Sequence, residues 1–169
     1  MVYHSFVLEK MLENNWLGDK TGQGFYKKGK DADGNTVIES LNLTTLEYSA
    51  QDKPRFDSIG KARGANRLSS KLGILYSGGD PAADFYHDII TAIAAYSANR
   101  IPEIADDLYQ IDDALRAGFG WEVGPFETWD LIGFDKVLAN IEKAGYVVPQ
   151  WILDFKAKGN TTFYKSEYG

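Results

Sequence analysis

The 169-residue chain contains no cysteine and only two histidines, His4 and His87. Without cysteine it has no disulfide, thiolate nucleophile or cysteine-ligated metal, and the composition fits a reducing compartment, which we expect to be the cytoplasm. General acid–base catalysis most often uses histidine. The scarcity of histidine therefore argues against a self-contained active site.

Long hydrophobic runs are also missing, because no apolar stretch approaches the roughly 18 residues that a membrane span needs. The formal net charge is −6, which argues against nucleic acid as a partner because phosphate backbones attract basic proteins. Hydrophobic residues make up 44% and aromatic residues 14% of the chain, a composition typical of a globular protein that is rich in aromatic side chains. The length corresponds to one ordinary domain or two small ones.

The segment Gly118–Gly133 combines glycines, a proline, tryptophans and phenylalanines. Its first two glycines, which flank a phenylalanine, can end a helix with a positive φ. Pro125 suits the first turn of a new helix, and Phe126 and Trp129 would share one face of that helix because they are three residues apart. The segment predicts a rigid aromatic corner between helices.

Apolar residues at helical spacing predict a mostly α-helical chain. Two short extended runs, Gly24–Lys28 and Thr36–Glu39, flank the turn residues Asp31–Asn35 and predict a small β-hairpin. Asp80 is a strong helix start because a proline follows it. Besides the corner, we expect helices over residues 1–15, 55–76 (in two pieces), 80–98, 103–110, 111–118, 137–145 and from 149 onward, and irregular structure over 40–55.

The segment Phe85–Tyr96 is apolar on nearly all sides, which favours a central buried helix. It ends at the polar pair Asn99-Arg100, and Pro102 then kinks or breaks the helix. A polar pair at the end of so apolar a helix needs hydrogen-bond partners. The pair either ties the helix end or faces a cleft.

Three basic residues, Arg63, Arg67 and Lys71, follow one another at a spacing of four, which would place them on one helical face. They are candidates for binding a phosphate-bearing ligand or an acidic partner, although most such stripes are simply solvated. Acidic residues also cluster over 103–113. There we expect a solvated helix face with Asp112 as a helix cap, in preference to a metal site.

Two turns resemble ligand loops but lack the required context. Gly22-Gln23-Gly24 follows a predicted helix and precedes a hairpin, whereas a phosphate loop follows a strand and precedes a helix. Asp31–Asn35 lacks the glycine and glutamate positions of an EF-hand. We interpret both as turns, and we expect neither a metal nor a cofactor to bind within this chain.

Two segments of the chain resemble each other, Lys10–Lys27 and Pro149–Lys165. Each has an apolar helix, a lysine with a glycine nearby, one or two threonines and then Phe-Tyr-Lys. The second copy has several helices before its Phe-Tyr-Lys, and the first has only a short segment. The repeat therefore predicts that most of the first copy lies upstream and that the chain is the C-terminal part of a longer protein.

These motifs resemble the C-terminal helical domain of the 3-hydroxyacyl-CoA dehydrogenase family, as in multifunctional enzymes of fatty acid β-oxidation. Residues 18–26, Gly-Asp-Lys-Thr-Gly-Gln-Gly-Phe-Tyr, are similar to the closing motif of that domain. Ala98-Asn99-Arg100-Ile101 and Gly124-Pro125-Phe126, with the residues around them, resemble the body of a second copy. The resemblance implies the end of a first copy over residues 1–28, a hairpin and linker helices over 29–79, and a second copy over 80–169.

The resemblance implies a fold of the 6-phosphogluconate dehydrogenase C-terminal type and an enzyme that oxidises L-3-hydroxyacyl-CoA with NAD. It implies that NAD and the catalytic His–Glu pair belong to a Rossmann domain that this chain lacks, so the fragment alone is expected to be inactive. Implied partners are that domain, the first helical copy, acyl-CoA and a possible second subunit. Asn99 aligns with the family's active-site asparagine. The alternatives are a non-catalytic dimerisation or docking module and a stand-alone acyl-CoA binder.

Overall fold

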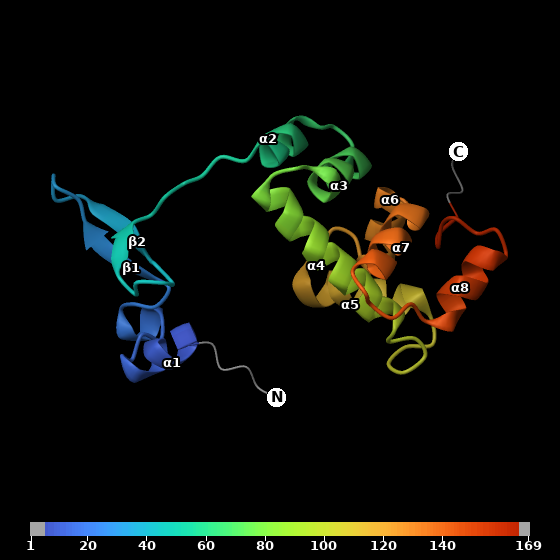
Figure 1. Ribbon diagram of the computed structural model, residues 1–169, viewed down its shortest axis with the longest axis horizontal. Coiled ribbons are helices and arrows are strands. Elements are labelled where there is room, and N and C mark those ends of the chain that lie inside the picture. Colours follow the sequence, from blue (N-terminus) through green and yellow to red (C-terminus); the bar gives the residue numbers. More distant parts are fainter. Residues whose placement is uncertain (1–5, 166–169) are drawn as a thin grey trace. The chain divides into compact units, whose positions relative to one another are not determined.

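The computed structural model describes residues 6–165, so His4 and the first five positions of the predicted N-terminal helix lie outside the described residues. The chain divides into two compact units, Met1–Pro54 and Arg55–Gly169, and Figure 1 labels their helices and strands. The division falls within the segment 29–79 that the sequence assigned to a hairpin and linker. We describe each unit by itself.

Unit 1 contains a short helix and a small sheet. After α1 (Phe6–Glu13) and a 3-10 turn, strands β1 (Tyr26–Lys30), β2 (Thr36–Leu41) and β3 (Tyr48–Ala50) form an antiparallel sheet in the order β1-β2-β3. The predicted hairpin is confirmed, with Lys28 opposite Ile38. The prediction of irregular structure over 40–55 is wrong at β3.

The sequence pattern did not predict the third strand, because the turn before it is formed by polar side chains and not by a recognisable glycine turn. The side-chain oxygen of Asn42 accepts the amides of Thr44 and Thr45 at 2.9 and 3.1 Å, and Leu46 adopts a positive φ of 59°. The backbone amide of Asn42 donates to Glu47. The hairpin that results brings Tyr48 opposite Leu41.

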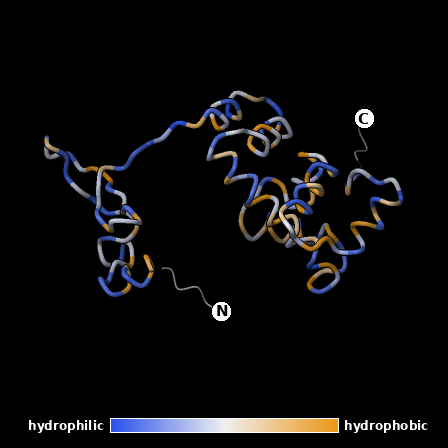
Figure 2. Tube along the Cα trace, viewed as in Figure 1, coloured by the Kyte–Doolittle hydropathy of each residue, from blue (hydrophilic) through white to orange (hydrophobic). Residues whose placement is uncertain are grey.

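Unit 2 is helical throughout its described elements, and the mostly α fold class is confirmed. Figure 2 shows that hydrophobic residues recur along these helices. None of the helices in the described part of the chain is long and apolar enough to cross a membrane. The helices of unit 2 are α2 (Asp57–Gly64), α3 (Leu68–Ser77), α4 (Pro81–Ala98), α5 (Leu108–Phe119), α6 (Pro125–Ile132), α7 (Phe134–Lys143) and α8 (Gln150–Ala157).

Helix α4 begins where the sequence predicts. The Asp80 carboxylate accepts the amide of Ala83 at 3.0 Å and thereby satisfies a free donor of the first turn. It also accepts the amide and the hydroxyl of Ser58, both at 2.8 Å. One capping side chain therefore joins the starts of α2 and α4.

The predicted aromatic corner is confirmed and forms the core of unit 2. Phe126 and Trp129 are buried on α6, with ring centroids 6.4 Å apart. The Trp129 indole donates to the carbonyl of Phe134 at 2.9 Å. Gly120 ends α5 with a φ of 66°, whereas Gly118 lies inside that helix.

Helix α4 is not buried on all sides, which corrects the prediction of a central buried helix. Its large side chains Phe85, Ile89 and Tyr96 are 68%, 40% and 63% exposed. Small residues such as Ala94 and Ala98 fill the buried face instead. The apolar residues of this helix therefore form two faces, one packed within unit 2 and one exposed.

The segment after α4 also differs from the prediction. Residues 103–107 are not helical, and α5 begins at Leu108 with Asp107 as its N-terminal cap residue. The Gln110 side chain accepts the amides of Asp106 and Asp107, which fixes the helix start three residues before the predicted Ile111. This reciprocal capping places Asp112 in the second turn of α5, where it is free to act elsewhere.

Candidate functional site

Asn99 stands at the C-terminal end of α4 and ties that end to the rest of unit 2. Its side-chain nitrogen donates to the carbonyl of Ala95 and to the carbonyl of Val147, each at 2.8 Å. The second bond crosses to the segment between α7 and α8. Of the two roles considered for the Asn99-Arg100 pair, Asn99 performs the tying of the helix end.

A mostly apolar cavity of about 370 Å³ lies beside Asn99, so its side chain also borders open space. The indole of Trp151 donates to the carbonyl of Ala98 at 2.9 Å and anchors the same helix end to α8. The two backbone acceptors account for both amide hydrogens of Asn99.

The three predicted basic residues do not share one helical face, because the helix breaks between them. Arg63 lies on α2, Arg67 is the residue before α3, and Lys71 lies on α3. The break occurs at residues 65–67, where Ala65 is extended. The sequence pattern predicted a broken helix here but not its effect on the stripe.

Arg63 and Lys71 nevertheless meet at one cavity of about 460 Å³ between α2, α3 and α4. Its apolar lining includes Ile59, Leu75 and Phe85, whereas Arg67 does not line it. Two cations at the edge of an apolar cavity suit a ligand that is apolar along one part and anionic at another.

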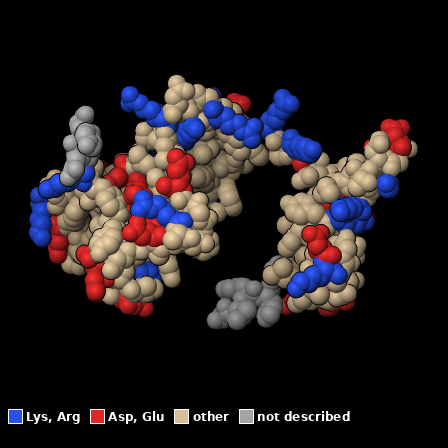
Figure 3. All heavy atoms as spheres, turned by 180° about the vertical axis from the view of Figure 1, so that it is seen from behind, with Lys and Arg blue, Asp and Glu red and all other residues tan. Residues whose placement is uncertain are grey.

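The charge of this region contrasts with that of the whole chain. Residues 55–71 contain five basic residues and one acidic residue, although the chain as a whole carries a net charge of −6. Figure 3 shows Lys and Arg side chains gathered over α2 and α3. An anionic ligand would therefore find a locally positive surface here.

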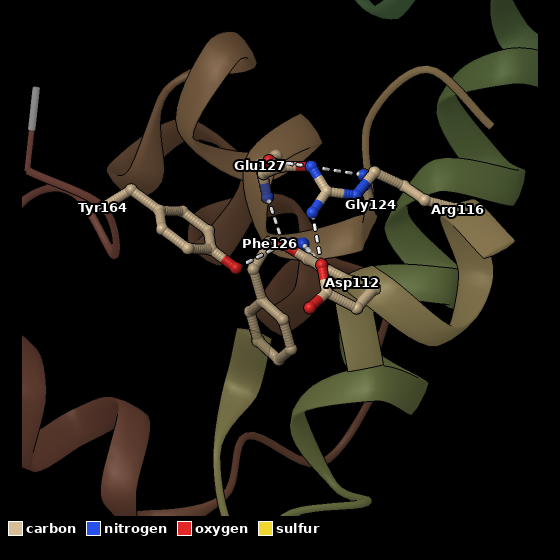
Figure 4. Close-up of polar contacts among 7 residues, drawn as sticks. Asp112, Arg116, Gly124, Phe126, Glu127 and Tyr164 are labelled. Carbon is tan, nitrogen blue, oxygen red and sulfur yellow. Dashed lines mark hydrogen bonds and ion pairs between the residues drawn. The ribbon is translucent and has the colours of Figure 1, made fainter. Parts of the chain in front are cut away.

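Asp112 on α5 is a fully buried carboxylate (Figure 4). Its carboxylate accepts the amides of Phe126 and Glu127 at 2.9 and 3.0 Å, and the Tyr164 hydroxyl at 2.7 Å. Asp112 therefore caps the start of α6, not of its own helix. Asp112 is thus a helix cap, as predicted, but it is buried and not part of a solvated face, because it caps a helix that packs against its own.

Gly124 lets α5 and α6 approach each other at this point. A Cβ added there would lie 2.4 Å from the Cα and Cβ of Asp112, so only glycine fits. The Gly124 amide donates to Glu127 at 2.7 Å, and Arg116 pairs with Glu127 at 2.8 Å and with Asp113. The glycine, predicted as a helix restart, is required by close packing.

A second carboxylate, that of Asp130 on α6, binds the C-terminal segment. Asp130 accepts the amide of Phe163 through both oxygens and the amide of Tyr164, all at 2.9 Å. Together with the Tyr164–Asp112 bond, these contacts bind the second Phe-Tyr-Lys motif to the aromatic corner. The sequence repeat identified the motif but could not identify the carboxylates that bind it.

Burial controls the proton equilibria of this cluster. It raises the pKa of Asp112, against hydrogen bonds from Phe126, Tyr164 and Glu127 that lower it. It likewise raises the pKa of Asp130, against the amides of Tyr164 and Phe163. Burial and then the bond to Asp112 raise the pKa of Tyr164, so its hydroxyl remains a donor. The cluster is arranged for structural support.

The comparisons with known proteins define the class of this domain. Residues 89–160 match the family model of the 3-hydroxyacyl-CoA dehydrogenase C-terminal domain. This region contains Asn99, Asp112 and the whole aromatic corner. Residues 89–160 therefore carry the signature of the 3-hydroxyacyl-CoA dehydrogenase C-terminal domain, as the motifs indicate.

Three curated relatives extend the similarity over most of the chain. A Bacillus subtilis protein named "Probable 3-hydroxyacyl-CoA dehydrogenase" is 40% identical over 96% of this chain and 20% of its own length. Proteins of Rickettsia felis and Rickettsia prowazekii, each named "Putative fatty acid oxidation complex trifunctional enzyme", are 27% and 25% identical over 86% of this chain and 19% of their lengths. The chain thus spans about a fifth of these relatives. No solved structure gives a significant match.

Proposed function

We propose that this chain is the C-terminal helical part of an NAD-dependent L-3-hydroxyacyl-CoA dehydrogenase of fatty acid β-oxidation, acting in the cytoplasm. The parent enzyme would convert 3-hydroxyacyl-CoA to 3-ketoacyl-CoA. Residues 1–28 would end a first helical copy, residues 29–79 would link the copies, and residues 80–169 would form the second. The names of the three relatives and the match over residues 89–160 support this assignment.

The exposed apolar face of α4 carries the proposal. Phe85 and Ile89 leave much of their surface in water and border an apolar cavity of about 420 Å³ that Trp121 also lines. Large exposed apolar surfaces mark interaction sites. This face would contact the first helical copy of the parent polypeptide or the same face of a second subunit.

NAD would accept the hydride in the parent enzyme, but the described residues do not fit it. The strands of unit 1 form an antiparallel sheet, whereas dinucleotides bind at parallel βαβ units. The chain also lacks a Gly-x-Gly-x-x-Gly sequence. A Rossmann domain elsewhere in the parent would bind NAD, and this chain would contribute binding and positioning only.

The acyl-CoA cleft is proposed at the basic side of unit 2. Arg63 and Lys71 would pair with phosphates of coenzyme A, because they edge an apolar cavity in a locally positive region. Arg67 would contribute through its charge alone. Asn99 keeps a proposed role beside the substrate, since it borders the smaller cavity at the end of α4.

The alternative function is a helical docking module with no ligand. One observation favours it: Asn99 donates both amide hydrogens to the carbonyls of Ala95 and Val147. In that case Asn99 fixes the helix end, and only the α4 face serves the parent protein. Deleting the module would then weaken assembly without changing turnover per assembled enzyme.

Turnover separates these functions. The purified chain mixed with acetoacetyl-CoA and NADH should leave the NADH absorbance unchanged, and consumption of NADH by the pure chain would contradict the proposal. A parent enzyme lacking this segment should lose activity, and adding the chain in trans should restore it. Full activity of the truncated parent would exclude a part in the cleft.

The α4 face has a matched test. Ile89→Asp should prevent rescue of the truncated parent, because it places a charge in the proposed contact. Leu153→Asp on α8 changes a residue of similar exposure, 39% against 40%, and should leave rescue intact. Equal rescue by the two variants would place the contact elsewhere on the chain.

The basic cavity is tested by titrating coenzyme A. Arg63→Glu and Lys71→Glu should each weaken binding about tenfold, the order expected for loss of a charge-assisted contact. Arg67→Glu should weaken it less, because Arg67 does not line the cavity. Absence of coenzyme A binding by the unaltered chain, or a uniform effect of all three variants, would remove this assignment.

A further inference from the structure

Unit 1 leaves much of its apolar surface in water. Met11 and Leu41 are the buried hydrophobic residues of its described part. A unit of this length has little apolar surface to bury and is only marginally stable by itself, and large exposed apolar surfaces mark interaction sites. Between residues 6 and 26, six large hydrophobic side chains are 46–63% exposed: Phe6, Leu8, Leu12, Leu17, Phe25 and Tyr26.

The second Phe-Tyr-Lys motif indicates what kind of surface binds the first. In unit 2 the Phe163 ring lies 5.2 Å from the Trp129 ring, inside the aromatic corner. The amides of Phe163 and Tyr164 donate to Asp130, and the Tyr164 hydroxyl donates to Asp112 at 2.7 Å. A docked motif of this sequence therefore needs aromatic rings around the phenylalanine and carboxylates for the amides and the hydroxyl.

The first motif has the same groups in a fixed shape but lacks these contacts. The amide of Phe25 donates to none of the described residues, whereas its carbonyl accepts the Leu41 amide at 2.9 Å. The Tyr48 hydroxyl donates to the carbonyl of Gly24, just before the motif. Because the backbone is already ordered, docking of Phe25 and Tyr26 would cost little conformational entropy.

We propose that Phe25 and Tyr26 dock on a helical domain with the same aromatic corner as unit 2, namely the first helical copy of the parent polypeptide. That domain would surround Phe25 with aromatic rings. Its carboxylates would accept the Phe25 amide, as Asp130 does for Phe163, and the Tyr26 hydroxyl. The inference rests on the proposed function and adds the contacts that would join unit 1 to the first copy. The relatives have room for such a domain, because this chain spans about a fifth of their length.

Hydrogen exchange of the amide at residue 25 tests the contact. In the intact parent this amide should exchange about 100-fold or more slowly than in the isolated chain, because it gains an acceptor and is covered. The amide of Phe163 serves as the reference and should exchange slowly in both, since Asp130 already accepts from it. Equally fast exchange at residue 25 in the parent and in the chain would overturn the proposal.

Two variants of the parent separate docking from a general effect on unit 1. Phe25→Asp should return the amide at residue 25 to the fast exchange of the isolated chain, because a charge is costly inside an aromatic cage. Leu43→Asp is the matched control, since Leu43 is 54% exposed and lies outside the motif, and it should leave the exchange slow. Equal exchange rates in the two variants would refute the contact.

Photo-cross-linking identifies the surface that receives the motif. Benzoylphenylalanine in place of Tyr26 should cross-link, within the parent, to a segment that repeats the Gly-Pro-Phe of residues 124–126 and has a carboxylate where unit 2 has Asp130. A cross-link to any other segment would overturn the assignment. So would a cross-link between copies of the isolated chain, which would make a second copy the occupant.

These measurements are independent of dehydrogenase activity, because none of them follows NADH. A parent that shows the slow exchange and the expected cross-link but no turnover would remove the dehydrogenase assignment and keep the contact. An active parent with fast exchange at residue 25 would keep the assignment and remove the contact. The two failures are therefore distinguishable.

Discussion

The tripeptide Phe-Tyr-Lys occurs twice in the chain, once in each unit, and the two occurrences have different environments. Phe163 and Tyr164 are partly buried in unit 2, whereas Phe25 and Tyr26 in unit 1 are 46% and 58% exposed. The three residues are the same in both places. The difference therefore arises from what each segment packs against.

In unit 2 the phenylalanine enters an aromatic cage. The Phe163 ring lies within about 5 Å of the rings of Phe126, Trp129, Phe134 and Phe155, at centroid distances of 5.1, 5.2, 5.3 and 5.2 Å. Such pairs stabilise beyond the area they bury. The carboxylate of Asp130 then fixes the backbone of the same residue.

In unit 1 the segment around the phenylalanine is fixed through its backbone. The Leu41 amide donates to the Phe25 carbonyl at 2.9 Å, and the Tyr48 hydroxyl donates to the carbonyl of Gly24. The segment is held in shape while its two aromatic side chains remain exposed. This contrast is what the repeat predicts if the cage for Phe25 belongs to helices outside this chain.

The largest expected effect is the difference between two matched truncations. Phe163→Ala should destabilise unit 2 by about 3 kcal/mol, because it empties the cage. Phe25→Ala should cost about 1 kcal/mol or less in unit 1, since half of its surface is already in water. Urea unfolding of each variant measures both, with near-ultraviolet circular dichroism as the probe. Equal losses would contradict the contrast drawn here.

The sequence alone predicted much of this fold for identifiable reasons. Asp80 before a proline and Pro125 itself are local signals, and the helix starts they predict are confirmed. The aromatic corner was predictable because Phe126 and Trp129 have the spacing of one helical face. Strand β3 was missed because its turn depends on the Asn42 side chain and not on glycine.

The candidate sites were less predictable because they depend on tertiary contacts. Asp112 was assigned to the surface, since nothing local shows that a carboxylate on α5 will cap α6. Arg63 and Lys71 were paired by spacing, and a break in the helix changed how they meet. For α4, an apolar surround could not distinguish a helix buried on all sides from one with an exposed apolar face.

The second prediction removes the Asp112 carboxylate, which bonds both to Tyr164 and to the start of α6. Asp112→Ala should destabilise unit 2 by about 3 kcal/mol, because two backbone amides and the Tyr164 hydroxyl lose their acceptor in a buried place. Asp113→Ala is the matched control, since that side chain is largely exposed, and should cost about 0.5 kcal/mol. Chemical denaturation of both variants gives the comparison. A loss below 1 kcal/mol for Asp112→Ala would show that the hydrogen bonds to Asp112 are not required for the stability of unit 2.

The third prediction uses two glycines that respond with opposite signs. Gly124→Ala should destabilise unit 2 by about 2 kcal/mol, because the added methyl overlaps the backbone of Asp112. Gly118→Ala should stabilise it by about 0.5 kcal/mol, because Gly118 is inside α5 with nothing within 4 Å of its Cβ position. Thermal melting of the two variants checks both signs. A stabilising Gly124→Ala would mean that α5 and α6 do not approach this closely.

The smallest expected effect concerns the Tyr164 hydroxyl, which donates to Asp112. Tyr164→Phe should cost about 1 kcal/mol at pH 7, because Asp112 loses one of its three donors. Tyr26→Phe should cost nothing measurable. Because the folded-state pKa of Tyr164 is raised above its unfolded value near 10, the unfolded state releases this proton first, and its contribution to stability declines as the pH rises above 10. The difference in unfolding free energy between the wild type and Tyr164→Phe should therefore shrink from pH 9 to pH 11, and a constant difference would show that the hydroxyl titrates alike in both states.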